Sequence, residues 1–166
     1  TQKSLMNKQQ IEIFQSDSSL PKSLKVELGN GVAITLQNTI CLSVKVEGNV
    51  PSKKNQKQII WSKRLQRSFI IPSKNHKDWH TMALYQLKMD AVRPLMLSSV
   101  QLIILRLSAP SLRKYDLTNK SESVMDLLVD YGLLEDDNSD IVPLLLLVKE
   151  PKSKTGFFEA QIYTQS

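Results

Sequence analysis

The sequence predicts a single α/β (α+β) domain, in which two main helices pack on one mixed β-sheet. Three observations predict this fold. The chain has 166 residues, a usual length for one domain and enough to bury a sizeable core. Several short segments alternate apolar and polar residues, whereas two longer segments space their apolar residues by three and four. In chain order these segments are strands, helix, strand, helix, strand and strand.

The first strands are predicted close to the start of the domain. Leu24–Leu28 and Val32–Leu36 both alternate, and the turn-prone pair Asn30-Gly31 separates them, which predicts a β-hairpin. Thr39–Val46 alternates in the same way, and its period of two predicts a half-buried strand.

The middle of the chain predicts two short strands, a helix and a longer strand. Ile59–Trp61 and Ser68–Ile71 are the short strand candidates. His76–Arg93 has apolar residues at helical spacing, and Pro94 follows where the helix is expected to end. Val100–Leu107 is rich in β-forming residues and is long enough for a central strand.

The last third predicts a second helix and two further strands. Thr118–Tyr131 carries an apolar stripe, and Gly132 stands at the position of a C-terminal cap. Ile141–Val148 is strand-like, but Pro143 favours an edge strand or a later start. Phe157–Tyr163 is the final predicted strand.

The composition indicates a basic globular protein. The net charge is +6 and the pI is about 9.4, so we expect an anionic partner. The single cysteine excludes an internal disulfide, and no apolar run approaches the length of a membrane span. We therefore expect a cytoplasmic protein with no membrane partner. Residues 1–22 are interpreted as a polar tail or a weak first element, and residues 23–166 as the domain.

The segment 48–77 contains eight basic residues and no acidic residue. Lysine and arginine at this density neutralise backbone phosphates and give affinity that depends on salt but little on sequence. A solvated loop is the alternative. Trp61 lies within the segment, and we expect it in the core rather than stacked on a base. The expected DNA contacts here are Lys53, Lys54, Asn55, Lys57, Arg64 and Arg67.

The segment Asp116–Asp140 has the opposite charge. It contains eight carboxylates and one lysine, which leaves about +13 on the rest of the chain. If the strand after Asp137 lies beside the strand that ends at Pro110, Asp116 and Asp137 meet at one end of the sheet. Converging carboxylates would bind Mg²⁺, with Mn²⁺ as a substitute. In the alternative interpretation, Asp116 or Thr118 caps the helix and the acids after the helix form a polar loop.

Two smaller patterns bear on the site. Glu122, Asp126 and Asp130 share one side of the predicted helix, as a metal-binding face or as a solvated face. His76 and His80 are four residues apart on the other helix, a spacing that permits metal binding. Since neither a cysteine nor a third histidine accompanies them, we expect surface or core histidines.

Three segments together resemble the RusA family of Holliday junction resolvases, over roughly residues 40–163. V-P-S-K-K-N at 50–55 resembles the Pro-Ser-x-x-Asn segment of that family. R-K-Y-D-L-T-N at 113–119 resembles its Arg-rich approach to D-x-D-N, and G-L-L-E-D-D-N at 132–138 resembles its paired-aspartate element. Each motif is short, but their order and spacing are fairly specific.

The resemblance implies a homodimeric, Mg²⁺-dependent endonuclease that nicks four-way DNA junctions symmetrically. It also implies a nucleoid-associated protein with no small-molecule substrate. Two positions depart from the family pattern: Thr118 stands where the second aspartate is usual, and Glu122 stands where a catalytic lysine is usual. Lys114 or a lysine of the basic segment would then have to supply the positive charge. The residues implied as metal ligands and catalytic groups are Asp116, Asp136, Asp137 and Glu122. The further implied DNA contacts are Lys114, Asn119 and Lys120.

The sequence thus leads to the hypothesis of a junction-resolving endonuclease acting in recombination and repair. Two alternatives remain open. The lysine-to-glutamate departure at Glu122 motivates a branched-DNA-binding protein that does not cleave. The second alternative is an RNA-binding or assembly protein, in which the acidic side of the helix is exposed to solvent.

Overall fold

The computed structural model describes residues 23–29, 32–53 and 57–165. The expected N-terminal tail (residues 1–22), the turn Asn30-Gly31, and the candidate DNA contacts Lys54 and Asn55 lie outside the described residues. The observed architecture is α+β, with a mixed four-stranded sheet, two two-stranded sheets and two helices in the described part of the chain.

The central sheet contains β3 (Thr39–Glu47), β6 (Leu102–Ser108), β7 (Leu145–Lys149) and β8 (Phe157–Gln165). Its strand order is β3-β8-β6-β7. β8 is antiparallel to both of its neighbours, whereas β6 and β7 are parallel, so the sheet is mixed, as predicted. The prediction of one sheet is wrong, because β1-β2 and β4-β5 form sheets of their own. Except for one half-buried residue, β6 is buried throughout, as expected for a central strand covered on both faces.

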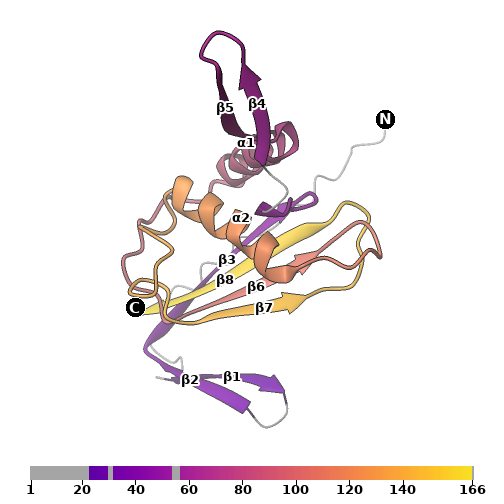
Figure 1. Ribbon diagram of the computed structural model, residues 1–166. Helices are drawn as coiled ribbons and strands as arrows, with labels where there is room; N and C mark the ends of the chain where they lie inside the picture. The colour runs from indigo at the N-terminus through magenta and orange to yellow at the C-terminus, as the bar shows by residue number, and fades with distance from the viewer. Residues whose placement is uncertain (1–22, 30–31, 54–56, 166) are drawn as a thin grey trace, which may run out of the picture.

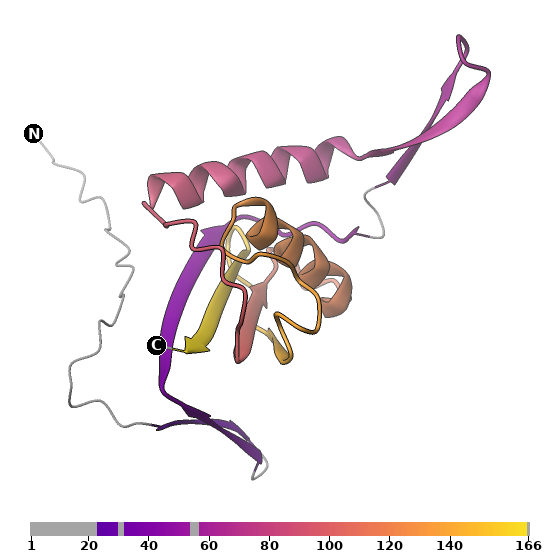
Figure 2. The same cartoon turned by 90° about the vertical axis from the view of Figure 1, so that its left-hand side faces the viewer.

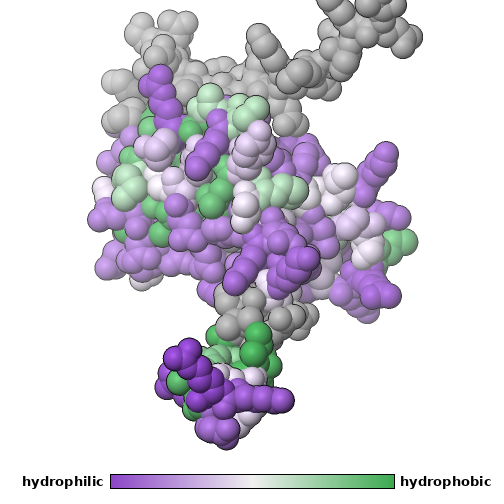
Figure 3. All heavy atoms as spheres, turned by 90° about the horizontal axis from the view of Figure 1, so that it is seen from above, coloured by the Kyte–Doolittle hydropathy of each residue, from purple (hydrophilic) through white to green (hydrophobic). Residues whose placement is uncertain are grey.

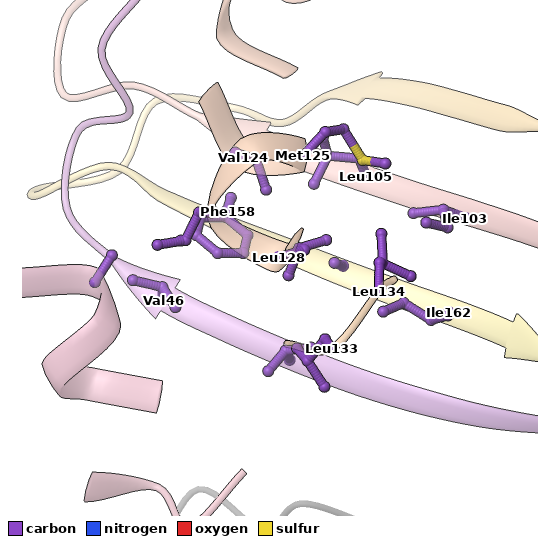
Figure 4. Close-up of a cluster of buried hydrophobic side chains, with 14 of the residues drawn as sticks. Val46, Ile103, Leu105, Val124, Met125, Leu128, Leu133, Leu134, Phe158 and Ile162 are labelled. Carbon is purple, nitrogen blue, oxygen red and sulfur yellow. The ribbon is translucent and has the colours of Figure 1, made fainter. Parts of the chain in front are cut away.

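Two helices form a layer on the sheet: α1 (Lys74–Met89) and α2 (Leu117–Asp130). α2 crosses one face of the sheet, and α1 runs above the end of β3 (Figures 1 and 2). The core lies between these layers. Figure 4 shows apolar side chains of α2, the sheet and the segment after α2 pointing toward one another. The labelled members are Val46, Ile103, Leu105, Val124, Met125, Leu128, Leu133, Leu134, Phe158 and Ile162.

The remaining strands form two hairpins. β1 (Ser23–Gly29) pairs with β2 (Val32–Gln37), as predicted, and Leu36 of β2 joins a small second core on the far face of the sheet. β4 (Lys57–Ser62) pairs with β5 (Arg67–Pro72), and this hairpin extends beyond the N-terminal end of α1, away from the body (Figure 2).

Two element ends show how local chemistry sets the boundaries. α1 ends at Met89, short of the predicted Arg93, because Asp90 is the cap and Ala91 has a left-handed φ of 54°. β7 begins only at Leu145 and lies at the sheet edge, as Pro143 had indicated. None of the helices in the described ranges is long and apolar enough to cross a membrane.

Candidate functional site

The β4–β5 hairpin exposes large apolar side chains. Ile59 and Ile70 face each other across the two strands and are 74% and 65% exposed. Trp61 is 56% exposed, so the expectation that it belongs to the core is wrong. The reason is position: the hairpin extends beyond the sheet and the helices (Figure 1), and none of its described side chains belongs to a core cluster. Exposed apolar groups of this size commonly mark an interaction surface.

Basic side chains accompany these apolar groups on the same hairpin. Lys63, Arg64 and Arg67 are all exposed, and the Arg67 guanidinium lies 4.6 Å from the centre of the Phe69 ring. In Figure 3 the hairpin forms a separate lobe on which strongly hydrophilic and hydrophobic residues lie together. Lys57 belongs to β4, but its side chain lies outside the described part. The hairpin therefore combines positive charge with accessible apolar surface.

Lys53 stands near the hairpin, beside the acidic side of α2. Its Nζ lies 3.0 Å from Asp126 Oδ2 and also donates a hydrogen bond to Asp126 Oδ1 at 3.2 Å. The pKa of Lys53 is raised, first by the hydrogen bond to Asp126 and also by the negative charges of Asp126, Glu122 and Asp137. Carboxylates from α2 and from the loop after it therefore stabilise the positive charge of this lysine.

Asp116 has both carboxylate oxygens engaged at the start of α2. Oδ1 accepts hydrogen bonds from the backbone N–H groups of Thr118 at 2.9 Å and Asn119 at 3.3 Å. Oδ2 accepts one from Asn119 Nδ2 at 2.7 Å. This arrangement is an N-cap, which satisfies helix donors that would otherwise lack partners. The capping interpretation of Asp116 is therefore confirmed.

Asp136 is engaged in the loop after α2. Its Oδ1 accepts from the Asp137 backbone N–H and its Oδ2 from Asn138 Nδ2, both at 2.8 Å. These hydrogen bonds stabilise the charged form and lower the pKa of Asp136. The polar-loop interpretation accounts for these contacts.

The predicted meeting of Asp116 with Asp137 does not occur. β7 does lie beside β6, as the prediction assumed, but the two strands are parallel. The residues before β7 therefore lie at the beginning of β6, whereas Asp116 follows its end. α2 lies between the two positions in the chain, and its 14 residues extend about 20 Å, at about 1.5 Å per residue. In the described part of the chain, no three His, Cys, Asp or Glu side chains form a group that would hold a metal ion. The predicted convergence of Asp116, Asp136, Asp137 and Glu122 is therefore absent.

Lys120 is placed where DNA contact is not possible in this conformation. It is only 7% exposed, and its Nζ donates hydrogen bonds to Asn49 Oδ1 at 2.9 Å and to the Val50 carbonyl oxygen at 2.5 Å. The same ammonium lies 4.7 Å from the centre of the Tyr115 ring. Burial lowers the pKa of Lys120. Its role is structural: it joins α2 to the segment that leads to the hairpin.

Two further candidates for DNA contact differ in exposure. Asn119 is buried and its side chain is held by Asp116, so it too is removed from direct DNA contact. Lys114 is exposed in the segment before α2 and remains available. Glu122 is exposed on α2, as is Thr118 in its first turn.

The structure also joins residues that the sequence did not connect. His80 Nε2 on α1 lies 2.9 Å from Asp130 Oδ2 on α2. These residues are fifty positions apart, and only the packing of the two helices brings them together. The four-residue spacing of His76 and His80 was visible in the sequence, but the carboxylate beside them was not. No protein-family model matches this chain, and no curated protein matches it either.

Proposed function

We propose that this protein binds DNA through the β4–β5 hairpin, and that branched DNA is its preferred ligand. One observation carries the proposal: the hairpin presents the exposed Trp61 beside the exposed Lys63, Arg64 and Arg67. The motif resemblance to junction resolvases supports branched DNA as the ligand class. Asp116 and Asp136, two of the predicted Mg²⁺ ligands, have their carboxylate oxygens engaged in local hydrogen bonds, so we favour binding over cleavage.

Each component of the hairpin has a physical role in the proposal. The cationic groups neutralise phosphates and release counterions, which gives affinity that falls as salt rises. Trp61 offers an aromatic face on which an unpaired base stacks, with a gain of about 1–3 kcal/mol per base. Ile59 and Ile70 provide apolar surface of the kind that inserts between base steps. Branch points expose base faces that continuous duplexes hide, so this combination favours branched DNA.

The test measures the affinity of the full chain for a labelled four-way junction, a duplex of equal length and a single strand, by fluorescence anisotropy over a salt series. We expect the tightest binding to the junction. Replacing Lys63, Arg64 and Arg67 by Ala should weaken binding at least tenfold at about 100 mM salt and reduce the salt slope by about 2–3. Trp61→Ala should weaken junction binding more than duplex binding.

A matched control removes the same charge from other surfaces. Lys88, Lys152 and Lys154 are exposed and lie outside the hairpin, so their triple replacement by Ala gives an equal loss of charge. If both triple variants lose the same affinity, the hairpin is not the binding surface. Equal affinity of the wild type for junction, duplex, single-stranded DNA and RNA would favour the alternative of an RNA-binding or assembly protein.

A second candidate function is the Mg²⁺-dependent junction endonuclease of the RusA type. One observation favours it: the Asp126 carboxylate of α2 lies 3.0 Å from Lys53 Nζ, and the charges of Glu122 and Asp137 also help to raise the pKa of this lysine. Mg²⁺, or Mn²⁺, would bind near these carboxylates by displacing Lys53. Two such sites in a homodimer would match paired nicks in the two strands of a junction.

Cleavage is tested with the labelled junction, Mg²⁺ or Mn²⁺, and three proteins: wild type, Asp137→Asn and Asp140→Asn. Asp140 lies in the same loop, and its replacement removes an equal charge. Metal-dependent nicking that is lost only in Asp137→Asn would support the nuclease. Junction binding without nicking in either Mg²⁺ or Mn²⁺ would support a DNA-binding protein that does not cleave. Light scattering of the eluting protein measures whether it is a dimer.

A further inference from the structure

The seam between α1 and α2 contains both histidines of the chain. His76 and His80 lie one helical turn apart on α1, and their ring centres are 5.9 Å apart. The Nε2 atoms of both rings are buried and have no hydrogen-bond partner among the residues that the structure describes. A buried imidazole nitrogen without a hydrogen bond is unfavourable, so His76 Nε2 beside the His80 ring calls for an explanation.

A carboxylate of the facing helix lies next to this pair. Asp130 Oδ2 is 2.9 Å from His80 Nε2, although the contact lacks the alignment of a hydrogen bond. Two ligands of one tetrahedral zinc ion, each about 2.0–2.1 Å from the metal, are about 3.3 Å apart. The observed separation is therefore within a few tenths of an ångström of the value that a shared metal ion requires.

The imidazole pair also has about the spacing that one metal ion requires. Two histidines bound through Nε2 to the same zinc ion have ring centres about 5 Å apart, from the same metal–nitrogen distance. The two rings here need to approach by less than 1 Å.

We propose that His76 and His80 bind a divalent transition metal ion, with zinc as the expected ion, and that Asp130 supplies the third protein ligand. The two imidazoles form the pair that is already in place. In the described residues no three ligating side chains yet surround a common point, so metal binding requires His76, His80 and Asp130 to move closer together. Imidazole ligands select zinc, copper or nickel rather than magnesium. The site is therefore chemically distinct from any Mg²⁺ site at Asp137.

The position of the site gives the metal a mechanical effect. His76 is in the first turn of α1, and this helix follows directly after the β4–β5 hairpin. A metal ion bound to both helices would hold the base of the hairpin against α2. The inference does not depend on DNA binding, because the ligands and their spacing stand without the proposed function.

Metal binding is measured on the full chain without an affinity tag, because the chain has only two histidines. We expect titration calorimetry to show one zinc ion per chain. The Co²⁺ complex should have the strong visible absorption of a tetrahedral site. His76→Gln with His80→Gln should weaken zinc binding at least a hundredfold. Asp130→Asn should weaken it about tenfold or more, whereas Asp140→Asn should leave it unchanged.

Several results would overturn the inference. One is the absence of zinc binding to the wild type. Another is an unchanged affinity for zinc in the variant that combines His76→Gln with His80→Gln. Wild-type proton spectra provide a measurement that is independent of how the variants fold. Zinc should shift the imidazole resonances of both histidines together, and shifts confined to other residues would contradict the site. Failure of DNA binding alone would not affect any of these readouts.

Discussion

Two lysines, Lys120 within α2 and Lys53 beside it, show how different partners give the same side chain different roles. Lys120, in the first turn, is buried and its ammonium is held by the neutral oxygens of Asn49 and Val50. Lys53 reaches the third turn of the helix from outside, remains partly exposed and pairs with the carboxylate of Asp126. Burial lowers the pKa of Lys120, whereas the carboxylate raises that of Lys53.

The difference teaches which of the two positive charges is available to a ligand. If Lys120 left its site, the Asn49 side-chain oxygen and the Val50 carbonyl oxygen would lose the donor that it provides. Its positive charge therefore stabilises the fold and is not available to a ligand. Lys53 exchanges one anionic partner for another at low cost, because exposed ion pairs contribute little. A phosphate group therefore competes for Lys53 and not for Lys120.

The largest expected effect is that of Lys120→Ala on stability. The substitution leaves the Val50 carbonyl and the Asn49 amide oxygen without their donor, and it removes the packing of the lysine stem. We expect a loss of about 2–3 kcal/mol in the free energy of unfolding, measured by urea denaturation. Lys53→Ala is the matched control and should cost less than about 1 kcal/mol. Equal losses in the two variants would remove the distinction between the lysines.

The next effect separates capping from ligand chemistry at Asp116. Asp116→Ala removes the acceptor for the backbone N–H groups of Thr118 and Asn119, and should cost about 1 kcal/mol of stability. Asp116→Asn keeps a side-chain oxygen that accepts these hydrogen bonds, so it should lower the free energy of unfolding by only about a few tenths of a kcal/mol. Urea denaturation measures both. A loss of DNA binding or cleavage in Asp116→Asn with unchanged stability would instead indicate a direct functional role.

A smaller effect is the coupling between Lys53 and Asp126. A double-mutant cycle with Lys53→Met and Asp126→Asn should give about 0.2–1 kcal/mol at low salt, because the pair is exposed. The coupling should shrink toward zero in about 1 M salt, where the screening length falls to about 3 Å. A coupling that is large and insensitive to salt would show that this pair is a buried structural element like Lys120.

The smallest expected effects are opposite pH dependences of stability. The folded-state pKa of Lys120 is below its ordinary value of 10.5, so the folded protein loses this proton first. The contribution of Lys120 to stability therefore rises as the pH increases from the lowered pKa toward 10.5. The pKa of Lys53 is above 10.5, so its contribution is complete below that pH and falls as pH rises through the raised value. Unfolding curves measured between about pH 9 and 11 test both trends. Lys120→Met should lose the rise of stability with pH, and Lys53→Met should lose the fall.

The sequence predicted those features that depend on nearby residues. Alternation located the strands, Pro143 indicated the late start of β7 at the sheet edge, and Gly132 marked the end of α2. Contacts between residues that are distant in the chain could not be predicted from the sequence. Lys53 and Asp126 are 73 residues apart, and nothing in the spacing of either residue selects the other.

The candidate site shows the same division. The acidic segment and the basic segment were recognised from composition, but the parallel pairing of β6 with β7 decides that Asp116 and Asp137 lie apart. The exposure of Trp61 was missed because its strand pattern is the same whether a core lies beneath the hairpin or not. Such outcomes depend on where whole elements are placed, which local patterns do not encode.

The position of β8 has a consequence for how the chain assembles on the ribosome. β8 is the last strand in the described chain, yet it lies between β3 and β6 and pairs with both. Its partner Thr39 is 126 residues earlier than Gln165. The sheet therefore cannot form until nearly all of this sequence has been synthesised. Such distant pairings slow folding. A nascent chain that stops before Phe157 would leave the edges of β3 and β6 unpaired and open to aggregation.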